Sequence, residues 1–248
     1  MLSTRTASFF VLACGITWVL AFPAAFAWLR HEEPPAWSIP LLGLSAFGPT
    51  IAAVIVASRR GELRSVFRPW RTNPIWIVIA LFLPMAIQIV ARLIDVALGG
   101  EPSTWVNLPN TPERVMALVV FSIGEEFGWR GFAQPRATRR YGPVVGGLVV
   151  GIGWAIWHLM YMVRPETGEI DLLNALVMVM LPAYSVVFVW LMQRARGSLA
   201  VALAFHAGGH LDSINHSPDE LRVPLITIAL VIVLAILAAR SLRRSRSE

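Results

Sequence analysis

Eight apolar runs, most of them long enough for a bilayer-spanning helix, follow one another along the 248-residue chain. They cover residues 8–29, 37–57, 75–98, 115–134, 144–162, 172–192, 199–214 and 223–239. A helix needs about 20 predominantly apolar residues to cross the hydrocarbon core. Charged residues make up only 15% of the chain, against roughly 25% in a typical soluble domain. These features predict an all-α fold, a polytopic membrane helical bundle of about eight transmembrane helices, as a single integral membrane domain over residues 1–248.

Two of the runs leave an alternative open. The first follows Arg5 and contains Ala25, Phe26 and Ala27, a small-x-small pattern typical of signal-peptide cleavage. Its length of about twenty residues is long for a signal peptide and favours a retained helix. The seventh run is short and contains Gly208 and Gly209. We expect this helix either to enter from a cavity or to be partly unwound.

The arginines alternate between the loops in a way that predicts orientation. With the N-terminus taken as cytoplasmic, one side receives Arg5, Arg59, Arg60, Arg64, Arg68, Arg71, Arg136, Arg139, Arg140, Arg194, Arg196, Arg240, Arg243, Arg244 and Arg246. The other side receives only Arg30, Arg114, Arg164 and Arg222. Cytoplasmic loops of membrane proteins are enriched in arginine and lysine, so both termini are predicted to be cytoplasmic. The same distribution explains the pI near 10.8 without nucleic-acid binding, which we exclude.

The fourth run contains three charged residues where a membrane helix normally has none. Glu125, Glu126 and Arg130 each cost about 3 kcal/mol near the bilayer centre unless they are paired or hydrated. Glu126 and Arg130 are four residues apart with the acid first, the favourable order for an ion pair on one helix face. Glu125 lies about 100° round the helix and is predicted to be left for chemistry. The alternative is a buried triad that only fixes helix packing.

Three histidines fall within other predicted helices: His158, His206 and His210. At a rise of about 1.5 Å per residue, they and Glu125 lie roughly 14 to 22 Å from the predicted cytoplasmic helix ends. Three helices therefore bring polar groups to a similar level of the membrane. His206 and His210 are four residues apart, which suits either two metal ligands or two hydrogen-bond donors directed at one oxygen.

The residue types allow two hydrolytic mechanisms. A desolvated glutamate, hydrogen-bonded to a histidine of the neighbouring helix, can take a proton from a water that attacks a carbonyl, while the other histidines stabilise the oxyanion. Alternatively, Glu125, His158, His206 and His210 would bind Zn²⁺ as an N3O ligand set. Such a closed set leaves no open position or base, so the mechanism without a cofactor is preferred. An H-E-x-x-H motif is excluded because Ala207 follows His206.

The ordered motifs resemble those of the CAAX-processing and bacteriocin-processing (CPBP) intramembrane proteases, relatives of the Ras-converting prenyl-protein endopeptidases. The matching residues are Glu125, Glu126 and Arg130, then Trp154 and His158, then His206 and His210. The resemblance implies that Glu125 and His158 activate water and that His206 and His210 stabilise the oxyanion. It implies supporting roles for Glu126, Arg130 and Trp154. The family more usually has Phe at Trp154 and Asn or a small polar residue at His210.

Three functions remain as hypotheses. The leading one is an intramembrane endopeptidase of a prokaryotic inner membrane. Its substrate would be a membrane-associated protein or peptide: a prenylated tail, a leader peptide or a membrane-protein segment. The second is a noncatalytic scaffold or bacteriocin-immunity-type protein with a peptide-binding cavity. The third is an ion or proton transporter, because intramembrane carboxylates and histidines also form proton relays. In each case the lipid bilayer is the surrounding partner.

Overall fold

The computed structural model describes residues 4–59, 61–67, 70–101, 105–106, 108–211 and 221–244. The elements are α1 (Thr4–Leu29), α2 (Ser38–Ser45), α3 (Gly48–Ser58), α4 (Leu63–Val66), α5 (Pro74–Ala97), α6 (Pro112–Glu126), the π-helix η1 (Phe127–Ala133), α7 (Gln134–Tyr141), α8 (Pro143–Trp157), the 3-10 helix η2 (His158–Tyr161), α9 (Leu172–Arg194), α10 (Leu199–Gly209) and α11 (Arg222–Arg244). No strand occurs within these residues, and an isolated bridge joins Val163 to Ile170. The all-α prediction is confirmed.

Each of the eight apolar runs contains helix, but the runs differ in how well they could span a membrane. Five helical segments are long and apolar enough: α1, α5, α8 with η2, the part of α9 from Ala175, and α11. The pair α2 and α3 would be a sixth span, bent by 62°. Within the described residues, α6 does not meet this test and α10 is a shorter apolar helix. The chain is therefore an integral membrane protein with five or six spanning candidates, and the count of eight stays a prediction.

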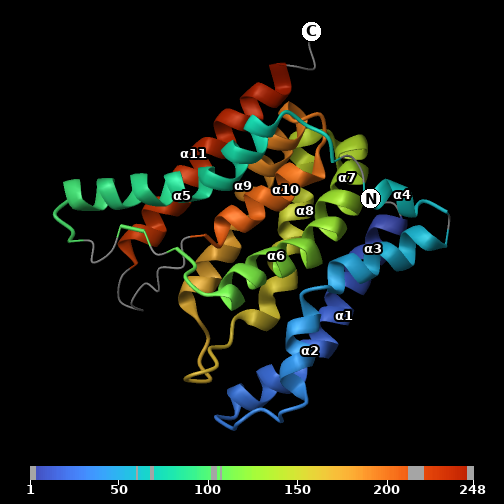
Figure 1. Cartoon of the computed structure of the whole chain (residues 1–248), viewed down its shortest axis with the longest axis vertical. Coiled ribbons are helices and arrows are strands. Elements are labelled where there is room, and N and C mark those ends of the chain that lie inside the picture. Colours follow the sequence, from blue (N-terminus) through green and yellow to red (C-terminus); the bar gives the residue numbers. More distant parts are fainter. Residues whose placement is uncertain are drawn as a thin grey trace.

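The helices form a bundle with α1, α2 and α3 along one flank and α5 and α11 along the other (Figure 1). Between these flanks lie α6, α8, α9 and α10. The closest pairings include α8 with α9, α10 with α5 and α11 with α9. Residues 212–214 of the seventh predicted run, and Arg60, Arg68 and Arg246, lie outside the described residues. The polar residues predicted to form a site are thus on the central helices, between the two flanks.

Helix starts follow local sequence signals. Before α5, the Asn73 side chain accepts a hydrogen bond from the backbone N–H of Ile75, and Pro74 occupies the first turn. Before α6, the Thr111 hydroxyl accepts from the N–H of Arg114. Side-chain oxygens at these positions satisfy N–H groups that have no partner within the helix. The break between α7 and α8 falls at Gly142, whose φ of 83° is accessible to glycine at little cost.

The helix that carries the charged motif departs from the continuous α-helix expected over residues 115–134. From Phe127 to Ala133 the backbone is a π-helix, so the motif crosses the junction between two helix types. A π segment accommodates an extra residue and shifts the faces that follow it, and such segments are frequent at functional sites. After the shift, Trp129 and Phe132 pack on Phe9 of α1 at centroid distances of 5.3 and 5.2 Å. Arg130 instead faces the interior of the bundle, where it is buried.

Glycines allow this segment to approach its neighbours closely. A Cβ atom at Gly128 would collide with the backbone of Pro49 in α3, and one at Gly131 would collide with the carbonyl of Val66 in α4. Small residues are common where membrane helices meet, because they let the backbones come together. The contact fixes the position of the charged motif against the α1–α4 side of the bundle.

Candidate active site

A buried charge network joins η1 to α10. Arg130 Nη1 donates to Glu126 Oε1 at 3.0 Å, which confirms the ion pair expected from the spacing. The same Glu126 oxygen lies 2.7 Å from His206 Nδ1. Both side chains of the ion pair are fully buried. Glu126 therefore links the two helices as well as pairing within its own, a connection that the i, i+4 spacing did not predict.

The Arg130 guanidinium lies against two aromatic rings. Its central carbon lies 3.7 Å from the ring centroid of Phe188 in α9 and 4.2 Å from that of Trp154 in α8. A cation over an aromatic face is stabilised by the ring quadrupole, and more strongly when water is excluded. Arg130 thus contacts α8 and α9 in addition to Glu126. This arrangement explains how a guanidinium is held inside a membrane protein.

Glu125 is hydrogen-bonded to the neighbouring helix α8, but not to the histidine that the sequence predicted. Its Oε2 accepts a hydrogen bond of 2.6 Å from the indole Nε1–H of Trp154. Its Oε1 lies 3.8 Å from His206 Nε2. The hydrogen bond expected with His158 is replaced by this one, because Trp154 is one turn earlier on the same face of α8 and its indole reaches Glu125 directly. Glu125 is nonetheless buried, with 5% of its surface exposed.

His158 stands where α8 ends and η2 begins. Its Nδ1 is 2.8 Å from the Trp154 carbonyl oxygen. A carbonyl can only accept a hydrogen bond, so Nδ1 carries the hydrogen and the neutral ring keeps its lone pair on Nε2. The ring also packs edge-on against Trp157, with centroids 4.8 Å apart. The backbone of α8 therefore orients the imidazole and leaves Nε2 able to accept a proton.

The predicted residues meet around two adjacent cavities. The larger, of about 1060 Å³, is lined by Glu125, His158 and His210 among others. The smaller, of about 190 Å³, is lined by Trp154, His158, His206 and His210. His206 and His210 stack with their ring centroids 5.2 Å apart, as expected for residues four apart on a helix. The structure thus brings the seven predicted residues into one region.

One polar pair at this site was missed in the sequence. The Tyr161 hydroxyl lies 2.6 Å from Ser45 Oγ, and Tyr161 lines the larger cavity with Glu125. The two residues are 116 positions apart, so no local spacing predicts the contact. The available signal was Tyr161 itself, which follows His158 by three residues and therefore lies close to the same helix face.

The possible Zn²⁺ site is not preformed among the described residues. No group of three or more histidine, cysteine, aspartate or glutamate side chains there is arranged to hold a metal ion. His206 directs Nδ1 to Glu126, and His158 directs Nδ1 to a backbone carbonyl. An N3O set would therefore have to use Nε2 of these two rings.

Comparisons with known proteins agree with the motifs. Residues 107–211 match the family model described as Type II CAAX prenyl endopeptidase Rce1-like. This part of the chain is therefore similar to the Rce1-like family. A protein named CAAX prenyl protease 2 from Methanococcus maripaludis is 22% identical over 218 residues, which cover 80% of each chain. The resemblance expected from the sequence is confirmed, and the matched region contains all seven candidate site residues.

Proposed function

We propose that the chain is an intramembrane endopeptidase that hydrolyses a peptide bond in a membrane-associated protein or peptide. The observation that carries this proposal is the placement of Glu125, His158 and His210 around one cavity of about 1060 Å³ within the Rce1-like region. A buried carboxylate beside an oriented imidazole provides the groups that general-base hydrolysis requires. The comparisons favour this reading over a noncatalytic scaffold.

In the proposed reaction, Glu125 and His158 activate a water molecule. Glu125 takes the water proton while the Nε2 lone pair of His158 holds the second hydrogen, and the oxygen adds to the substrate carbonyl carbon. The Trp154 indole fixes one Glu125 oxygen by its hydrogen bond and so leaves the other for the water. When the carbon–nitrogen bond breaks, the Glu125 carboxyl returns the proton to the leaving amine.

His206 and His210 are proposed to stabilise the oxyanion. The Nδ1 of His206 already faces Glu126, so only the protonated ring can also donate from Nε2. Charge balance supports that form. Two carboxylates and one guanidinium leave the cluster with one excess negative charge, which an imidazolium neutralises. His210 is more exposed and lines both cavities, so it can reach a bound carbonyl from the open side.

We also propose that the chain crosses a prokaryotic inner membrane eight times as a single domain. Both termini would then be cytoplasmic. Three contacts, each between segments predicted to be cytoplasmic, support this arrangement. Arg5 near the start of α1 pairs with Glu62 before α4, which also pairs with Arg136 of α7. Arg194 at the end of α9 donates to Ser241 near the end of α11. These are the segments predicted to be cytoplasmic.

The larger cavity is also lined by residues of the segment between η2 and α9, including Arg164, Glu166 and Asp171. The arginine distribution predicts that this segment faces away from the cytoplasm. We therefore propose that the peptide enters from that side or from within the bilayer. A leader peptide or a membrane-protein segment fits such access better than a prenylated tail on the cytoplasmic side.

The test compares the membrane proteomes of cells that express the wild type, Glu125→Gln or Glu113→Gln at matched levels. Glu113 is an exposed carboxylate at the start of the same helix, so its variant controls for loss of a negative charge. Mass spectrometry of protein N- and C-termini detects cleavage products without a prior choice of substrate. We expect termini that depend on Glu125 and persist in Glu113→Gln.

The same data distinguish the substrate classes, because each product pair reports where in a protein the cut falls. The proposal fails if wild type and a folded Glu125→Gln give identical termini. Folding of each variant is established from its cooperative unfolding in detergent, followed by the fluorescence of the ten tryptophans.

A further inference from the structure

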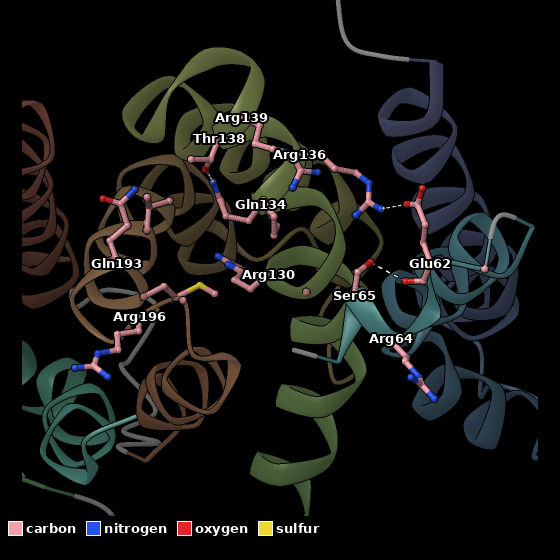
Figure 2. A pocket seen from close by; sticks show the side chains of 16 residues that line it. Glu62, Arg64, Ser65, Arg130, Gln134, Arg136, Thr138, Arg139, Gln193 and Arg196 are labelled. Carbon is pink, nitrogen blue, oxygen red and sulfur yellow. Dashed lines mark hydrogen bonds and ion pairs between the residues drawn. The ribbon is translucent and has the colours of Figure 1, made fainter. Parts of the chain in front are cut away.

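A third cavity, of about 1140 Å³, lies where η1 continues into α7. It is formed between η1 and α7, the region around α4 and the end of α9, and it shares no lining residue with the two cavities around His158. Figure 2 shows Arg130 and Gln134 between Glu62 and Arg136 on one side and Gln193 and Arg196 on the other. Nothing in the proposed hydrolysis uses this cavity.

The cavity is strongly positive. Five arginines line it, and the one carboxylate among its lining residues is Glu62. That carboxylate is already engaged, because it pairs with Arg136 at 2.5 Å and with Arg5 at 3.3 Å. Arg130 pairs with Glu126, which does not line the cavity, and the other three arginines, Arg64, Arg139 and Arg196, have no further carboxylate among the lining residues. Positive charges gathered in a concave site raise the local concentration of anions.

The inner wall carries buried groups that lack partners. The side chain of Arg130 is fully buried, yet its Nε and Nη2 have no hydrogen-bond partner among the described residues. Gln134 is 4% exposed, and its Nε2 donates to Thr138 while its Oε1 has no partner. The amide can equally be turned, because the Thr138 hydroxyl can donate to the oxygen instead. Turning it would direct a further N–H pair into the cavity beside Arg130.

The remaining lining groups suit a ligand at a membrane surface. Val189 and Met192 of α9 provide an apolar wall. Arg64, Arg139 and Arg196 are exposed and form the rim. This end of the bundle is the one predicted to be cytoplasmic, and basic pockets between helices on that side bind phosphate-bearing lipid headgroups.

We propose that this cavity binds a phosphate-type anion, either a lipid headgroup of the cytoplasmic leaflet or free phosphate, with its oxygens on Arg130 and the arginines of the rim. Guanidinium groups bind phosphate through paired, charge-assisted hydrogen bonds, which matches the two unpartnered nitrogens of Arg130. Arg130 also pairs with Glu126, so a bound anion shares a guanidinium with the candidate active site. The binding itself does not depend on whether the chain is a protease.

The experiment measures thermal unfolding of the full chain in a neutral detergent by tryptophan fluorescence. One arm adds phosphatidylglycerol, with phosphatidylcholine as the control for acyl chains. The other arm adds inorganic phosphate, with chloride at equal ionic strength as its control. A ligand that binds only the folded state raises the melting temperature, by about 5 °C near saturation for a chain of this size. We expect this rise with phosphatidylglycerol, with phosphate or with both, and no comparable rise with the controls.

Two matched double variants locate the site. Arg139→Gln/Arg196→Gln removes two rim charges, whereas Arg240→Gln/Arg243→Gln removes two charges near the end of α11, outside the cavity. The first should lose the shift or need at least about tenfold more ligand for half of it. The second should keep the shift. If the first double variant does not unfold cooperatively, Arg196→Gln alone provides the same comparison, because its side chain is exposed.

A shift with phosphatidylglycerol alone assigns the cavity to a lipid headgroup, and a shift with phosphate alone assigns it to the free anion. The proposal is overturned if the wild type shows neither shift. It is also overturned if both double variants weaken the shift equally, because that result would indicate a general effect of surface charge.

Discussion

The pair formed by Glu126 and Arg130 allows a quantitative test of the buried network. At 3.0 Å and an effective dielectric constant of about 20, the Coulomb attraction is about 5.5 kcal/mol, much of which is offset by desolvation of the two ions. Removing one partner of a buried pair typically costs 3–5 kcal/mol, because the other charge is left without compensation. We therefore expect Glu126→Gln to lower the free energy of unfolding by about 4 kcal/mol, since Arg130 would then face chiefly the rings of Trp154 and Phe188.

Removing Arg130 instead of Glu126 should lower the free energy of unfolding by a smaller amount. In Arg130→Met, Glu126 keeps His206 Nδ1 at 2.7 Å, so we expect a loss of roughly 2–3 kcal/mol. The double variant should lose about 3 kcal/mol rather than the sum, which gives a coupling energy of roughly 3 kcal/mol. Unfolding by increasing SDS in mixed micelles, followed by tryptophan fluorescence, measures all four proteins. Additive losses, or an Arg130→Met loss larger than that of Glu126→Gln, would refute the reasoning.

Four further predictions concern the candidate active site and the residues that position it. Trp154→Phe removes the N–H donor to Glu125, so unfolding in the same assay should become about 2 kcal/mol easier and cleavage should slow. Gly128→Ala should cost roughly 1–3 kcal/mol in that assay, whereas Gly15→Ala, whose Cβ meets no atom within 4 Å, should be neutral or stabilising. Tyr161→Phe should cost about 1 kcal/mol there, as expected for one lost hydrogen bond. Removal of divalent metals with a chelator should leave the rate of substrate cleavage unchanged, and recovery of a lost rate by Zn²⁺ would support the N3O alternative.

Patterns within single helices predicted the features that depend on helix geometry. The i, i+4 spacing of Glu126 and Arg130 gave the ion pair, because adjacent turns place such side chains together in any helix. The same rule gave the stacking of His206 on His210. Counting residues from the helix ends also placed Glu125 and His158 at one level, and they line one cavity. These inferences needed only the rise and pitch of a helix.

Features that depend on contacts between helices were not predictable in this way. The hydrogen bond from Trp154 to Glu125 needs two helices at one particular rotation and separation. The π-helix over Phe127–Ala133 changes that rotation by the equivalent of one residue, and no composition signal marked it. For the same reason, spacing within one helix could not show that Glu126 would contact His206. The sequence therefore identified the chemical groups more reliably than their partners.

Contacts from other helices give the adjacent residues Glu125 and Glu126 different environments. Helical spacing alone separated them into a paired carboxylate and an unpaired one, yet both are held by groups from other helices. Glu126 is in hydrogen-bond contact with Arg130 and His206, whereas Glu125 accepts a hydrogen bond from the neutral indole of Trp154 and lies 3.8 Å from His206 Nε2. The neutral indole positions one oxygen of Glu125 by a hydrogen bond and does not itself neutralise the carboxylate. This difference between the two glutamates, on which the proposed role of Glu125 rests, thus arises from residues of α8 and α10.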